Sequence, residues 1–172
     1  MKRKITVTAI IIICFLLQCT LFKSLAIASI SPNLLIIVTS SFGFMRGKRD
    51  GIYIGFLSGL LIDLFYGGVI GFYALLYMYT GFFNGFFRKL FYPEDIKLPM
   101  ILISASDIFC NLLIYFSRFF LRSRFAFRYY FIHIIAPEWV YTILVTVFLY
   151  FILLMINQRL EKSEKRRTGK VA

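Results

Sequence analysis

Apolar residues follow one another along this chain in six long blocks, and the charged residues gather in the short stretches between them. Apolar runs of about 20 residues are long enough to cross a bilayer as helices, whereas half-buried strands alternate apolar and polar positions. We therefore predict an all-α integral membrane protein with six transmembrane helices. The predicted spans cover residues 5–22, 30–45, 51–66, 69–87, 98–117 and 136–157.

Two of the predicted spans carry local signals of their own. The second is short, begins at Pro32-Asn33 and contains the hydroxyl residues Thr39, Ser40 and Ser41. The third and fourth are separated by little more than a pair of adjacent glycines, at 67 and 68. Because paired glycines favour tight turns, we predict a helical hairpin at that point.

Composition supports the membrane assignment. Hydrophobic residues make up 60% of the chain and the mean hydropathy is +0.80, against roughly half apolar in soluble domains. The net charge of +12 would suit a nucleic-acid partner, but the basic residues lie in the loops that flank apolar blocks, so we expect no nucleic acid. Cys14, Cys19 and Cys110 lie within apolar blocks without metal-ligand spacing, so we expect no metal and no cofactor.

The distribution of lysine and arginine indicates the orientation in the membrane. Both chain ends are strongly basic, and so are residues 46–49 and 88–97, which follow the second and fourth spans. Placing these four stretches in the cytoplasm puts most of the 20 basic residues there and requires an even number of spans. We predict a multi-pass protein of the cytoplasmic membrane with both termini in the cytoplasm. One transmembrane domain, 1–157, precedes a basic cytoplasmic tail, 158–172.

One predicted outer loop departs from this charge rule. In "SRFFLRSRFAFRYYFIH", residues 117–133, aromatic residues alternate with arginines. Such a segment can lie along the membrane surface with its rings in lipid and its guanidinium groups in water. This extracytoplasmic basic loop is either an interfacial anchor or a docking surface for an outer partner or lipid phosphates. Its arginines are Arg118, Arg122, Arg124 and Arg128.

A ridge of glycines leads to a carboxylate inside the third span. Gly51, Gly55, Gly59 and Asp63 recur at intervals of four residues, so they share one face of a helix. Small residues at this spacing let another helix approach closely. A charged side chain facing lipid costs about 2.5–3.5 kcal/mol. We therefore predict that this face packs against a helix or a partner and that Asp63 points inward.

Further acidic residues lie in the last two spans. Asp107 and Asn111 line a polar seam in the fifth span, and Glu138 follows Pro137 at the start of the sixth, where a helix dipole favours negative charge. We predict that Asp63 or Glu138 pairs with arginines of the extracytoplasmic basic loop. The alternative is that these acids form a proton or cation path.

Catalytic motifs of the common enzyme classes do not occur in the sequence. It has one histidine, His133, and neither a phosphate-binding glycine loop nor a dinucleotide fingerprint. We therefore predict a protein that is not an enzyme and has no catalytic residue.

Several features, taken in order, resemble the MreD family of bacterial rod-shape proteins. They are Pro32-Asn33 at the start of the second span, the basic turn "RGKRD" at 46–50, and "GFLSGLLIDLFYGGVIGFYAL" at 55–75. The last of these is similar to the family's glycine–aspartate motif. The resemblance points to Gly55, Gly59, Asp63 and Gly71, whereas the last third of the chain matches mainly in hydropathy.

The resemblance implies a function that the composition alone does not. It implies a non-enzymatic membrane scaffold of the cell-wall elongation machinery that regulates cell shape in peptidoglycan synthesis. Such a scaffold binds MreC, and through it links MreB filaments to RodA and a class B penicillin-binding protein. The resemblance also implies a fold similar to the S components of energy-coupling factor transporters.

Two other functions remain open from the sequence. One is a membrane-embedded subunit of a transporter that binds a small molecule between its helices. The other is an enzyme acting on lipid-linked precursors, in which the loop arginines would bind diphosphate and a carboxylate would act as base.

Overall fold

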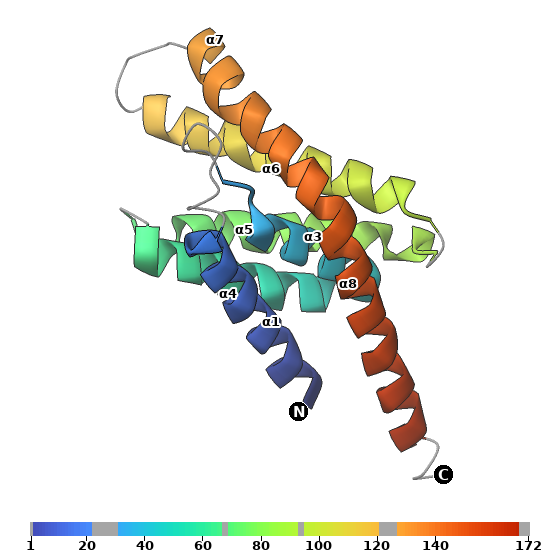
Figure 1. Ribbon diagram of the computed structural model, residues 1–172. Coiled ribbons are helices and arrows are strands. Elements are labelled where there is room, and N and C mark those ends of the chain that lie inside the picture. The colour runs from blue at the N-terminus through green and yellow to red at the C-terminus, as the bar shows by residue number, and fades with distance from the viewer. Residues whose placement is uncertain (1, 22–30, 67–68, 93–94, 121–126, 169–172) are drawn as a thin grey trace.

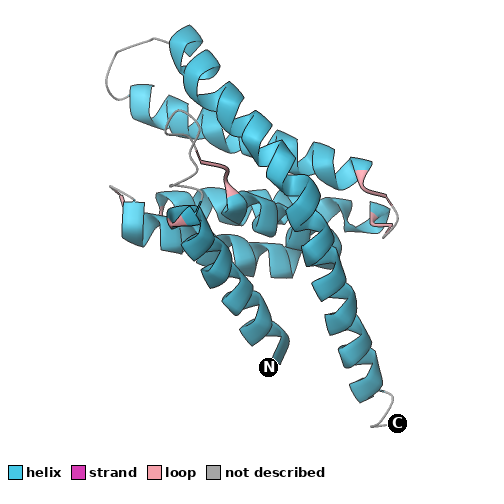
Figure 2. Ribbon diagram, viewed as in Figure 1, coloured by secondary structure: helices cyan, strands magenta, loops and turns pink. Residues whose placement is uncertain are grey.

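Helices make up every regular element in the part of the chain that the computed structural model describes (Figures 1 and 2). The described residues are 2–21, 31–66, 69–92, 95–120 and 127–168. The elements are α1 (Lys2–Cys19), α3 (Leu34–Arg46), α4 (Lys48–Tyr66), α5 (Phe72–Asn84), the 3-10 helix η1 (Gly85–Leu90), α6 (Lys97–Phe120), α7 (Phe127–Tyr130), the π-helix η2 (Phe131–Ile135) and α8 (Ala136–Thr168).

The six predicted spans correspond to α1, α3, α4, α5, α6 and α8. Among the described residues, two helical stretches are long and apolar enough to cross a membrane, Lys97–Ser117 and Phe131–Glu164. By contrast, α3 and α5 have 13 residues each, which gives a length of about 20 Å. That is shorter than the hydrocarbon core of a bilayer, about 30 Å. The helix count therefore agrees with the prediction, but these two helices are shorter than the predicted spans.

The short helix α3 forms the centre of the fold. Every residue from Leu34 to Met45 is buried, and α3 packs against α1, α4, α5, α6 and α8. Its first turn is capped by Asn33, whose side-chain oxygen accepts a hydrogen bond from the N–H of Ile36 at 3.3 Å. Asn33, which the sequence places at the start of the short second span, is thus the N-cap of a core helix.

The glycine face of α4 packs directly against α5, with which α4 forms an antiparallel hairpin (Figure 1). A Cβ at Gly55 would overlap the carbonyl group of Tyr77, and one at Gly59 would overlap the backbone of Tyr73. A Cβ at Gly51 would overlap the carbonyl group of Gly81 in α5, and a Cβ at Gly81 would overlap the carbonyl group of Gly51. The hairpin turn at residues 67 and 68 lies outside the described residues. Since α5 covers Gly51, Gly55 and Gly59, these three residues are not free to pack against a partner helix.

The sixth predicted span differs from expectation at its start. The N–H of Ala136 donates to the carbonyl of Phe131, and α7, η2 and α8 follow one another without a break. Pro137 lacks an N–H and crowds the preceding turn of an α-helix, and the wider π turn accommodates it. Glu138 does lie in the first turn of α8, but this turn is not a free helix end. The position of Glu138 in the first turn is thus confirmed, and the helix-dipole explanation for it stays a prediction.

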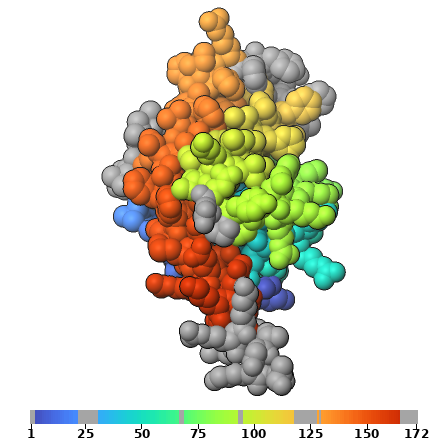
Figure 3. Space-filling view, turned by 90° about the vertical axis from the view of Figure 1, so that its right-hand side faces the viewer, coloured from blue at the N-terminus to red at the C-terminus, as the bar shows by residue number. Residues whose placement is uncertain are grey.

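The C-terminal helix also continues beyond the predicted domain boundary. In the space-filling view, α8 runs along one side of the visible face (Figure 3), and its ribbon extends beyond the other helices at its C-terminal end (Figure 1). It remains helical to Thr168, and Glu164 forms ion pairs with Arg3 and Arg46. The division at residue 157 stays a prediction, but the tail begins as a continuation of α8.

Substituting Gly55 by alanine tests the close contact between α4 and α5. Alanine is the better helix former by about 1 kcal/mol, yet its Cβ would force the two backbones apart. We expect a net loss of about 1–3 kcal/mol of stability, measured by thermal unfolding of the detergent-solubilised protein. Leu64→Ala, on the exposed face of α4, is the control and should change the melting temperature little. A Gly55→Ala protein as stable as wild type would contradict the packing described here.

Candidate functional site

Asp63 caps the beginning of the neighbouring helix α5. Its Oδ2 accepts hydrogen bonds from the backbone N–H groups of Gly71, at 3.0 Å, and Ala74, at 2.9 Å, and its Oδ1 accepts one from Tyr73 at 3.0 Å. The side chain is 2% exposed. Gly71 adopts a φ of 102°, a backbone conformation that favours glycine. The carboxylate thus satisfies N–H groups that the start of a helix leaves without partners.

This cap gives the Asp63 carboxylate backbone partners, and its predicted pairing with an arginine of the extracytoplasmic basic loop stays a prediction. In the described part of the chain Asp63 forms no ion pair, and its two carboxylate oxygens accept backbone donors instead. Arg118 belongs to α6, and Arg128 is exposed on α7. Arg122 and Arg124 lie outside the described residues. The role of the extracytoplasmic basic loop therefore stays a prediction.

The second acidic group lies between α6 and α8. Asp107 is fully buried, and Asn111, one turn further along α6, is 7% exposed. Glu138 of α8 faces both of them, and Thr142 of α8 lies beside Asp107. No hydrogen bond of good geometry reaches either carboxylate oxygen of Asp107. A buried polar group of this kind is uncommon, and Asp107 differs in this from Asp63, both of whose carboxylate oxygens accept hydrogen bonds.

Two further polar contacts join the central helices, and the sequence analysis did not identify them. The hydroxyl of Tyr77 donates to Oδ1 of Asn33 at 2.8 Å. The Nδ2 of Asn84 donates to the hydroxyls of Ser106, at 2.8 Å, and Ser40, at 3.4 Å. Tyr77 and Asn84 lie seven residues apart on the face of α5 that is turned to the core. Two polar side chains seven residues apart in an apolar block share one helix face, and this spacing could have predicted their contacts with the core.

An apolar groove opens between α5 and α6. Its volume is about 580 Å³, and several of its walls are large exposed side chains, such as Phe116, which is 60% exposed, and Leu75, which is 54% exposed. The walls of the groove consist almost entirely of carbon atoms. It can accept an apolar helix or an acyl chain. Among its lining residues are Phe72, Leu75, Tyr79, Phe83, Phe109 and Phe116.

The helices and the groove define a helical protein of the membrane class, with apolar surfaces that suit lipid or another helix. The sequence matches the family described as rod shape-determining protein MreD over residues 1–160. The chain therefore belongs to the MreD family, whose members are membrane proteins involved in determining rod shape. This match confirms the resemblance found in the sequence. Comparison with curated proteins and with solved structures gives no match.

Removing the Asp63 carboxylate should destabilise the hairpin of α4 and α5. Asp63→Ala leaves one buried and two partly buried N–H groups without their acceptor. We expect a loss of about 2 kcal/mol or more, seen as reduced accumulation in membranes and a lower melting temperature. Asp95→Ala is the matched control, because Asp95 accepts one exposed backbone N–H, from Lys97 at 3.0 Å. Equal melting temperatures for the two variants would contradict a structural role for Asp63.

Proposed function

We propose that this protein is a non-enzymatic scaffold of the cell-wall elongation machinery. In this proposal it crosses the cytoplasmic membrane six times with both termini in the cytoplasm. It binds MreC, and through MreC it links MreB filaments to RodA and a class B penicillin-binding protein. Membership of the MreD family supports the involvement in rod shape, and the structure supports particular elements for the contacts.

The groove between α5 and α6 is the observation that carries the proposal. A single-span partner presents an apolar helix, and aromatic side chains on two neighbouring helices form the ridges and holes into which such a helix packs. The glycine face of α4 cannot serve this purpose, since α5 of the same chain covers it. We therefore assign MreC's transmembrane helix to the α5–α6 groove.

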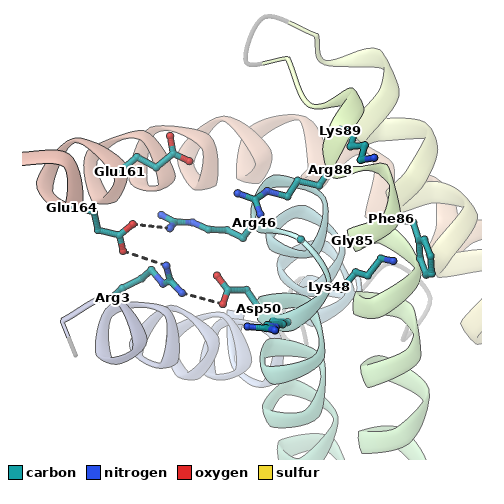
Figure 4. A pocket seen from close by; sticks show the side chains of 12 residues that line it. Arg3, Arg46, Lys48, Asp50, Gly85, Phe86, Arg88, Lys89, Glu161 and Glu164 are labelled. Atoms are coloured by element: carbon teal, nitrogen blue, oxygen red, sulfur yellow. Dashed lines mark hydrogen bonds and ion pairs between the residues drawn. The ribbon is translucent and has the colours of Figure 1, made fainter. Parts of the chain in front are cut away.

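The arrangement of basic residues supports the proposed orientation. Arg3, Arg46 and Lys89 come from the N-terminal segment and from the two loops assigned to the cytoplasm, and they border one hollow together with Glu164 of the C-terminal helix (Figure 4). The four stretches that the charge rule assigns to the cytoplasm thus meet at one end of the molecule. The helix α7 lies at the other end (Figure 1).

The alternative, a small-molecule-binding subunit of a transporter, is favoured by one observation. Asp107 is buried with unpartnered oxygens and lies beside Glu138, as a binding group for a cation or an amine would. However, neither Asp63 nor Asp107 lines any of the hollows described here. The similarity to transporter S components stays a prediction. Co-purification with an ATPase module and without MreC would favour this alternative.

Site-specific photocrosslinking tests the groove as the binding site. A photoreactive residue placed at Leu75 or Phe109, both in the groove, should crosslink to MreC in intact membranes. The matched controls are Leu144 and Phe148 of α8, which are 60% and 74% exposed and lie outside the groove. We expect the groove positions to give at least about tenfold more of the MreC adduct.

Two outcomes would contradict this assignment. Equal adducts from the groove and from α8 would mean that MreC does not select the α5–α6 groove. An absence of MreC adducts at all four positions, while MreC is recovered from the same membranes by affinity purification, would place the contact elsewhere on the chain.

A further inference from the structure

A large hollow with basic walls opens at the end of the molecule where α1 begins and α8 ends (Figures 1 and 4). Its volume is about 1470 Å³, and its walls come from α1, the turn between α3 and α4, η1 and α8. Three acidic residues, Asp50, Glu161 and Glu164, also border it. The basic residues that line it are Arg3, Arg46, Lys48, Arg49, Arg88 and Lys89.

Two of the arginines form ion pairs with two of the three acidic residues. Arg3 bonds Asp50 at 3.0 Å and Glu164 at 3.3 Å, and Arg46 bonds the other oxygen of Glu164 at 3.3 Å. Glu161 accepts a hydrogen bond from Asn157 at 3.1 Å. These contacts join α1, α3, α4 and α8 into one wall of the hollow.

The remaining four cations, Lys48, Arg49, Arg88 and Lys89, have no carboxylate partner among the described residues. Two of them are held in place by other contacts. The Nζ of Lys48 lies 3.3 Å from the centre of the Phe86 ring, a cation–π contact. The Arg88 side chain lies against Gly47, where a Cβ would meet its Cδ at 2.8 Å. The hollow therefore presents an uncompensated positive charge on a partly preorganised frame.

An apolar crevice continues from the basic hollow toward the core. It has a volume of about 250 Å³ and shares Arg3, Arg46, Arg49 and Asp50 with the hollow, and Asp50 is paired with Arg3. Deeper in, its walls are apolar and include Val7 of α1 and Ile54 of α4. Basic groups at the mouth and hydrocarbon behind them match a molecule with an anionic head and an apolar tail. A free anion or an acidic peptide would leave the apolar part unused.

We propose that this end of the protein binds an anionic phospholipid. Its phosphate lies among Lys48, Arg49, Arg88 and Lys89, and one acyl chain enters the crevice between α1 and α4. Bound in this way, the lipid bridges α1 and η1 across the hollow. The proposal needs no MreC, and it uses the proposed orientation only to name the leaflet, which is the cytoplasmic one.

Native mass spectrometry of the detergent-solubilised full chain tests this proposal. The probes are phosphatidylglycerol and phosphatidylcholine with identical acyl chains, and inorganic phosphate. The pocket variant is Arg49→Gln with Lys89→Gln, and the matched control is Arg159→Gln with Lys162→Gln, on exposed positions of α8 that line neither cavity. Each pair removes one arginine and one lysine. Equal melting temperatures without lipid show that both variants fold.

We expect wild type to bind phosphatidylglycerol at least about tenfold more tightly than phosphatidylcholine. The pocket variant should lose about tenfold in affinity for phosphatidylglycerol, a change that corresponds to about 1.4 kcal/mol, and the control variant should lose less than about twofold. Inorganic phosphate at the same concentration should not displace the lipid, because it lacks an acyl chain.

Other results would overturn the proposal in distinguishable ways. Equal losses of affinity for phosphatidylglycerol in the pocket and control variants would mean that the lipid responds only to the overall charge of the protein. Displacement by inorganic phosphate would leave an anion site without a lipid tail. Loss of a co-purifying cytoplasmic protein from the pocket variant, with lipid binding unchanged, would assign the hollow to a protein partner. None of these results bears on the groove between α5 and α6, so this proposal and MreC binding can fail separately.

Discussion

The contact on which the rest of the structure depends is the one between the Asp63 carboxylate and the first turn of α5. The N–H groups at the start of a helix have no partner within the helix, and in an apolar surrounding water does not supply one. Asp63 supplies the acceptors from α4, and the glycines of α4 bring the two backbones close enough for it to reach. This hairpin then holds α3 at the centre and sets the position of the α5 wall of the groove.

The two buried aspartates illustrate different uses of a carboxylate among apolar helices. Asp63 has its partners within the hairpin, so its burial is compensated and its role is structural. Asp107 lies beside Glu138 and Asn111 without a hydrogen bond to its oxygens. Folding therefore depends on the contact between α4 and α5. The surfaces proposed for binding are the α5–α6 groove, on another face of α5, and the basic hollow. This separation allows contacts to be altered without unfolding the chain.

Local spacing in the sequence was sufficient to predict the helices and the small face of α4, because residues at intervals of four necessarily share a helix face. The partner of Asp63 could not be predicted in the same way, since its donors are backbone N–H groups, which nearly every residue has. The ion pairs of Arg3 join segments that are 47 and 161 residues apart, so no local pattern announces them. Pro137 lies in the first turn of α8, as predicted, but the π turn before it could not be predicted, because proline usually ends or kinks a helix.

The central claim is that folding and partner binding reside on separate parts of this molecule. The most direct test is shape complementation in a rod-shaped host depleted of its own MreD, with the accumulation of each variant measured by blot. The account predicts that a groove variant, Leu75→Ala with Phe109→Ala, accumulates normally in the membrane and yet leaves the cells round. Asp63→Ala should instead leave the cells round because the protein fails to accumulate. A groove variant that restores rod shape, or an Asp63→Ala protein that accumulates fully and still fails, would contradict the account.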